Sequence, residues 1–104
     1  MQIFLVERAV PPAFDTTDAD QVALHSRWAT DAYQAVGIVW YGGVVAGGRM
    51  YSMLAADDAG VIERYRDSLH VAPQDMIVRK VDTFIGPAAA MARSDPRFRA
   101  PRAP

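Results

Sequence analysis

Residues 38–55 read IVWYGGVVAGGRMYSMLA, two apolar runs with three small residues between them. Valine, isoleucine, tyrosine and tryptophan favour β-strands, and glycines between two such runs favour a tight hairpin turn. We therefore predict strands over Ile38–Val45 and Arg49–Ala55, joined by a turn at Ala46-Gly47-Gly48.

The segment before this hairpin predicts a strand and a long helix. Gln2–Arg8 is rich in β-branched and aromatic residues, and prolines stop it. A polar stretch rich in Asp and Thr, which supplies helix caps, leads into Ala19–Val36, and Gly37 ends this helix.

The segment after the hairpin predicts a second helix and a last strand. Asp57 or Asp58 caps a helix that runs to about Leu69, and Met76–Ile85 is a further apolar run. The resulting order, β-α-β-β-α-β, predicts an α+β fold of the ferredoxin-like type, a four-stranded antiparallel sheet with two helices on one face.

Composition and charge narrow the class of protein. The 104 residues are 51% hydrophobic and 22% charged, which predicts one globular domain, residues 1–86. Residues 87–104 are rich in Ala, Pro and Arg and form a basic tail. The net charge of −1 argues against nucleic-acid or membrane partners, and the lack of cysteine excludes disulfides and thiolate metal sites. We expect a soluble cytoplasmic protein.

Both faces of the predicted sheet are apolar. Alternation sets Ile3 and Leu5 opposite Phe4 and Val6, and sets Trp40 and Val44 opposite Val39, Tyr41 and Val45. Two helices cover one face only. The side chains that we expect to remain uncovered are Phe4, Val6, Val39 and Tyr41. Because monomers rarely expose such a patch, we predict a homodimer that pairs sheet to sheet; the alternative is that the basic tail covers this face.

His25 is the most informative polar residue of the first predicted helix. On a helical wheel it falls within an apolar arc made of Val22, Leu24, Trp28, Ala29, Ala32 and Val36. An inward imidazole is either a structural group that hydrogen-bonds to the backbone or to a tyrosine, or a group lining a cavity as proton shuttle, ligand anchor or metal ligand. The sequence leaves both open. His70, next to a loop, is interpreted as a surface residue.

Strand residues supply partners for His25. We predict His25, Tyr51 and Arg79 as catalytic candidates, since the latter two can stabilise an enolate-like oxygen. The predicted substrate-binding residues are Trp28, Trp40, Ser52 and Glu7. The charged candidates have a structural interpretation as well. They form ion pairs across neighbouring strands, either Glu7 with Arg79 or Arg8 with Asp82.

Sharp catalytic motifs are absent from the sequence. It has no phosphate-binding glycine loop, no H-E-x-x-H and no G-x-S-x-G. Two histidines without cysteine disfavour a structural zinc site. A site shared across a dimer, with His25 and carboxylates as ligands, stays open for nickel or another divalent metal.

Several short motifs carry a family resemblance by their order. They are Phe4-Leu5-Val6-Glu7-Arg8 followed by Pro11, the helix with His25, the strand with Trp40, Arg49-Met50-Tyr51, and Ala72-Pro73-Gln74-Asp75-Met76-Ile77. Over residues 3–84 the chain resembles a small bacterial family of uncharacterised domains that includes a nickel-binding protein. The resemblance implies a dimeric α+β barrel, an architecture that includes cofactor-independent monooxygenases, muconolactone-type isomerases, polyketide cyclases and haem-degrading enzymes.

Two departures from that family affect what it implies. Ser52 stands where the family usually has cysteine, which removes a soft metal ligand, and Val71-Ala72 stands where a glycine is expected. The expected function is a homodimer with a pocket between the first helix and the sheet for a small hydrophobic ligand, as a cofactor-independent isomerase, cyclase or monooxygenase of planar substrates. The alternatives are a non-enzymatic nickel-binding stress protein built on His25 and a purely structural dimer, so enzymatic status stays open.

Overall fold

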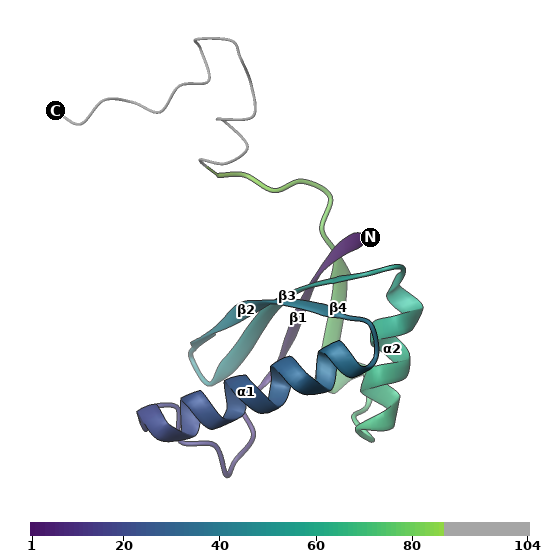
Figure 1. The fold of residues 1–104 in the computed structure, drawn as a ribbon. Helices are drawn as coiled ribbons and strands as arrows, with labels where there is room; N and C mark the ends of the chain where they lie inside the picture. Colours follow the sequence, from purple (N-terminus) through teal and green to yellow (C-terminus); the bar gives the residue numbers. More distant parts are fainter. Residues whose placement is uncertain (87–104) are drawn as a thin grey trace, which may run out of the picture.

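The predicted hairpin forms half of a four-stranded sheet. The computed structural model describes residues 1–86. Its elements are β1 (Gln2–Ala9), α1 (Ala19–Ala35), β2 (Val39–Ala46), β3 (Arg49–Ala56), α2 (Ala59–Ser68), the short 3₁₀ helix η1 (Pro73–Asp75) and β4 (Met76–Lys80). All strand pairs are antiparallel, in the order β2-β3-β1-β4. Both helices lie on one side of the sheet, which confirms the ferredoxin-like α+β fold (Figure 1).

Short-range signals in the sequence set the ends of these elements. The Asp18 carboxylate accepts backbone N–H groups of the first turn of α1, and Asp58 does the same for α2, so each satisfies donors that a helix start leaves free. Gly47 and Gly48 both have positive φ, as a type I′ hairpin turn requires, and Gly37 has positive φ just after α1. His70 is the non-glycine residue with φ of 58°, and it ends α2 in the left-handed conformation.

The last strand is shorter than predicted. It ends at Lys80 rather than at Ile85, with Lys80 opposite Phe4 of β1. β4 is an edge strand whose only neighbour in the sheet is β1. The Val81 N–H still donates to the Ile3 carbonyl, but β1 begins at Gln2, so the last residues of the predicted strand have no β1 partner. The predicted basic tail, residues 87–104, lies outside the described residues.

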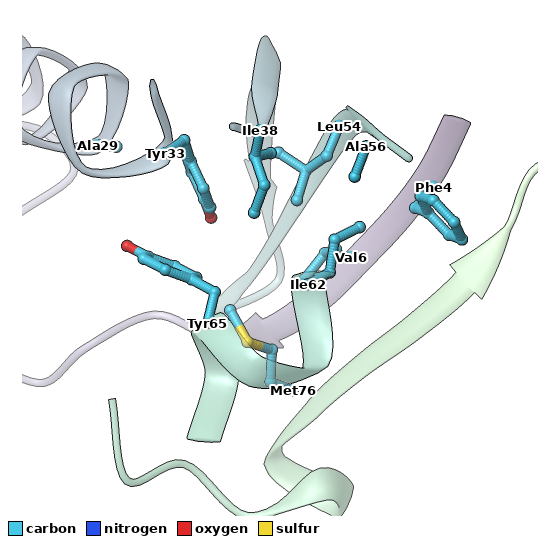
Figure 2. Close-up of a cluster of buried hydrophobic side chains, with 10 residues drawn as sticks. All are labelled: Phe4, Val6, Ala29, Tyr33, Ile38, Leu54, Ala56, Ile62, Tyr65 and Met76. Carbon is cyan, nitrogen blue, oxygen red and sulfur yellow. The ribbon is translucent and has the colours of Figure 1, made fainter. Parts of the chain in front are cut away.

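The hydrophobic core fills the space between the sheet and both helices. Figure 2 shows side chains from the sheet and from both helices meeting there, and the most buried large ones are Phe4, Leu54, Ile62, Met76 and Val6. The expectation that Phe4 and Val6 lie on the uncovered face is therefore wrong. Both faces are apolar, so alternation alone does not say which one the helices cover.

A β-bulge reverses the alternation of β2. The register with β3 shifts between Trp40 and Gly42, so Tyr41 is an extra residue in this strand. Beyond the bulge, Val44 lies on the uncovered face and Val45 on the helix face, next to Met50. The predicted grouping of Val44 with Trp40 is thus wrong, because regular alternation does not continue through a bulge.

Helix α1 buries less of its apolar arc than the wheel predicts. Only Ala29 and Tyr33 are buried, while Leu24 is 71% exposed and Trp28 is 54% exposed. The last turns of α1 pack on the core, and the first turns stand over the hairpin, where they wall the pockets described below. Neither helix of residues 1–86 has the length and apolar character that crossing a bilayer requires.

Candidate functional site

A pocket of about 490 Å³ lies between α1 and the β2–β3 hairpin. Its walls include Phe14, His25, Ala29, Trp40, Val45 and Ser52. Only glycine fits at position 43 on the sheet side of this pocket. A Cβ there would lie 2.6 Å from the Tyr51 carbonyl oxygen and 2.8 Å from Ser52 Oγ. The floor therefore combines small residues and one hydroxyl under aromatic walls, which suits a flat, largely apolar molecule.

His25 stands at the junction of this pocket and a second one. The second pocket is also about 490 Å³, and its lining includes Pro11, Leu24 and Trp28 besides His25. The imidazole stacks on Phe14 with ring centroids 4.5 Å apart, and Trp28 lies 6.0 Å away. Within residues 1–86 the ring has aromatic neighbours and no hydrogen-bond partner, which favours the cavity-lining interpretation over the structural one.

The surroundings of His25 favour its neutral form. Partial burial lowers the pKa of the imidazole below its usual value of 6.5, and the positive charge of Arg8 lowers it further. A neutral imidazole at neutral pH is able to accept a proton, and the nearby cation makes the imidazolium readily give the proton back.

The lowered pKa of His25 predicts a pH-dependent stability. Between the folded and unfolded pKa values the unfolded chain binds more protons, so the free energy of unfolding rises with pH in that interval. We expect the stabilising effect of the neutral ring to be full above about pH 6.5 and to be lost as pH falls through the lower, folded pKa. Thermal unfolding of the wild type and of His25→Gln, compared from about pH 8 to pH 4.5, measures this effect. A difference between the two proteins that does not change with pH would contradict it.

A second group of polar residues lies deeper than the main pocket. Arg8 follows Phe4 and Val6 on the helix face of β1, opposite Met50 and Met76. A cavity of about 20 Å³ brings its side chain together with those of His25, Ser52, Tyr33 and Tyr65. The prediction that either Glu7 or Arg8 faces inward is confirmed for Arg8.

The two tyrosines at this depth remain protonated. Their rings lie 4.9 Å apart (Figure 2), and burial raises the pKa of Tyr33 to about 12. Burial also raises the pKa of Tyr65, and the positive charge of Arg8 opposes the rise at both rings. Both hydroxyls are therefore available as hydrogen-bond donors at physiological pH.

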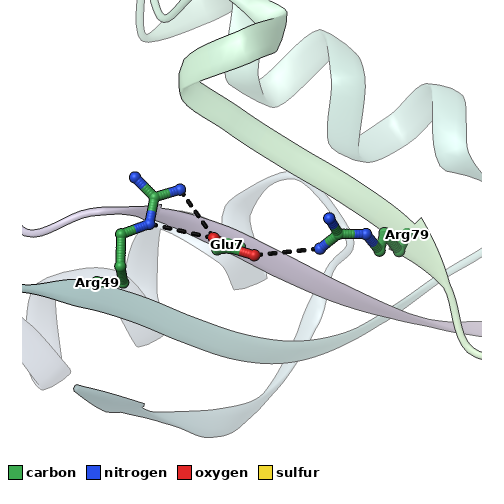
Figure 3. A network of polar contacts seen from close by, with 3 residues as sticks. All are labelled: Glu7, Arg49 and Arg79. Atoms are coloured by element: carbon green, nitrogen blue, oxygen red, sulfur yellow. Dashed lines mark hydrogen bonds and ion pairs between the residues drawn. The ribbon is translucent and has the colours of Figure 1, made fainter. Parts of the chain in front are cut away.

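The remaining charged candidates lie on the opposite face of the sheet. Glu7 accepts from Arg79 Nη1 at 3.1 Å and from Arg49 Nε at 3.1 Å (Figure 3), so the predicted Glu7–Arg79 pair is confirmed. The two guanidinium groups lower the pKa of the Glu7 carboxyl. The alternative pair of Arg8 with Asp82 does not form, since Arg8 lies opposite Met76.

The structure thus divides the predicted site residues into two groups. His25, Trp40 and Ser52 meet in the main pocket, and Trp28 borders the second pocket. Glu7 and Arg79 belong to the other face, so they do not meet a ligand held at His25 of the same chain. Tyr51 contributes to the pocket wall, but it lies opposite Glu7, and its side chain points to the uncovered face.

Phe14 and Arg8 are site residues that the sequence interpretation did not assign. Phe14 is an isolated aromatic residue in the polar loop before α1, and this isolation is the signal that could have marked it. Arg8 lies two residues after Val6 and four after Phe4, so it shares their face of β1. Once the helices are known to cover that face, Arg8 is assigned to the site side of the sheet.

A metal site at His25 would need ligands beyond those that the described residues place beside the ring. Within the described part of the chain, no three His, Asp, Glu or Cys residues come together in a geometry for a metal ion. The ring stacks on Phe14, and the positive charge of Arg8, which lowers the pKa of His25, also repels a cation. His70 caps the far end of α2, so it does not complete such a site.

Comparison with known proteins adds no relative. No protein-family model, no curated protein and no solved structure matches this chain. The ferredoxin-like fold is therefore established by the topology described above, and the function has to be inferred from the pocket itself.

Proposed function

We propose that this protein is a homodimer that binds a small, planar, hydrophobic molecule between α1 and the sheet. The observation that carries the proposal is the position of His25, a partly desolvated imidazole stacked on Phe14 at the junction of two pockets. Aromatic side chains on several sides favour a flat ring system. We also infer a cytoplasmic location, which rests on the amino-acid composition alone.

The same geometry supports a proton-transfer reaction without a cofactor. Neutral His25 takes a proton from the carbon next to a carbonyl group and returns it to another atom, which isomerises or cyclises the ligand. With dioxygen as a second substrate, the same carbanion would lead to oxygenation. Trp40 and Phe14 hold the ring in place while the proton moves.

The homodimer proposal rests on the uncovered face of the sheet. Val44 is 66% exposed and Tyr41 is 60% exposed on this face, and Val39 lies beside them. The same face carries Glu7, Arg49 and Arg79, whose mutual pairing offsets part of the cost of covering these charges. A second copy that pairs sheet to sheet covers this patch by two-fold symmetry.

The binding step is tested with 2-naphthamide, a flat and neutral probe. We expect it to quench the fluorescence of the chain's two tryptophans, Trp28 and Trp40, and to bind His25→Ala about two- to tenfold more weakly because one stacking face is lost. His70→Asn is the matched control, because asparagine tolerates the left-handed conformation at this position. The absence of binding to the wild type, or equal affinity in a folded His25→Ala, would remove the proposal.

A further inference from the structure

The inner cavity next to Arg8 has the size of a single oxygen atom or water molecule. Its volume is about 20 Å³, close to the smallest space that holds one water. Five of its lining residues also line the main pocket, so the inner cavity adjoins the floor of that pocket; they are His25, Ala29, Tyr33, Met50 and Ser52.

The charge of Arg8 lacks a counter-ion in the described part of the chain. The other two arginines of the sheet, Arg49 and Arg79, are both paired with Glu7 on the far face. No carboxylate of residues 1–86 lies within ion-pair distance of Arg8, which is only partly exposed. A partly desolvated guanidinium without a partner is unfavourable, so an anion that reaches it gains a charge-assisted hydrogen bond.

Hydrogen-bond donors surround the same cavity. Ser52 is 9% exposed, and its hydroxyl lies beside the gap that Gly43 leaves. Tyr33 and Tyr65, whose hydroxyls are protonated, also line this cavity together with Arg8. Such donors stabilise a negatively charged oxygen more than a neutral one.

We propose that the ligand of the main pocket is a planar apolar acid, and that its anionic oxygen, from a carboxylate or an enolate, enters the inner cavity and pairs with Arg8. This inference rests on the proposed function and names the chemical class of its ligand. The apolar body of the acid lies between the aromatic walls at His25 and Trp40. For a reacting ketone, Arg8 holds the enolate oxygen that forms when His25 removes the neighbouring proton.

The test compares 2-naphthoate with the isosteric, neutral 2-naphthamide, both followed by tryptophan fluorescence. We expect the wild type to bind 2-naphthoate about tenfold or more tightly than the amide. Arg8→Gln should abolish this preference while it leaves amide binding in place. Arg27→Gln is the control, because it removes an exposed cation from α1 and causes the same change in net charge.

The possible outcomes separate the two proposals. Binding of the amide without a preference for the acid, or a preference that persists in Arg8→Gln, overturns the anion inference and leaves the proposed function standing. Failure of both probes to bind the wild type overturns the proposed function and this inference with it. If Arg8→Gln does not fold, the ratio of the wild-type affinities for 2-naphthoate and 2-naphthamide decides whether the anion inference stands. Arg8→Lys is then expected to keep part of the preference for the acid.

Discussion

Replacing His25 by alanine is expected to slow the exchange of α-protons in 2-tetralone, a flat bicyclic ketone, by about a hundredfold or more. In deuterium oxide the neutral imidazole removes a proton next to the carbonyl group, and a deuteron returns to the same carbon. The lowered pKa of His25 keeps it in the basic form at neutral pH, and we expect Arg8 to stabilise the enolate oxygen. Loss of the proton signal in NMR spectra measures the rate.

The pH profile of this exchange separates a catalytic role of His25 from a structural one. The rate should rise with pH through a pKa below 6.5 and should then level off in the wild type. His70→Asn should keep both the rate and the profile, since His70 lies at the end of α2 away from the pocket. A folded His25→Ala protein that exchanges the ketone at the wild-type rate would show that His25 is not the base.

Replacing Val44 by lysine is expected to convert the proposed homodimer into monomers. Val44 is 66% exposed on the uncovered face, across the hairpin from Tyr51, so two copies paired there bury it against each other. Lysine adds a like charge on both sides of the two-fold axis and a desolvation cost that nothing offsets. The molar mass measured by light scattering after gel filtration should be twice the chain mass of 11.4 kDa for the wild type and equal to the chain mass for Val44→Lys.

The control for this experiment is Val36→Lys. Val36 is also exposed, but it caps the C-terminal end of α1 in the helix layer, where a positive charge is tolerated. We expect this variant to remain a dimer with unchanged thermal stability. A monomeric wild type, or a Val44→Lys protein that stays dimeric at micromolar concentration, would contradict the homodimer proposal.

The features that could be predicted from the sequence are those set by near neighbours along the chain. Asp18 and Asp58 cap helices through donors two or three residues away, and Gly47-Gly48 supplies the turn conformation. These signals locate the elements and thereby the fold. The end of β4 was missed because it depends on where β1 begins, some eighty residues earlier in the chain.

The features that could not be predicted depend on which face the helices cover. Phe4 and Tyr41 are both aromatic residues in apolar strand runs, yet Phe4 is in the core and Tyr41 is exposed, because the helices pack on one side and β2 carries a bulge. The same ambiguity placed Arg79 beside His25 in the predicted site, when the sheet separates them. His25 itself was found because its helical phase is a local property, whereas Arg8 and Phe14 reach it through tertiary packing.

The most direct test of the pocket is the NMR spectrum of the two histidine rings. The chain has only His25 and His70, so one substitution, His70→Asn, assigns both signals. We predict that His25 titrates below its usual value of 6.5 and that 2-naphthamide shifts the His25 signals without moving those of His70. A His25 ring that titrates at or above the usual value and does not respond to the probe would contradict a ligand pocket built around this residue.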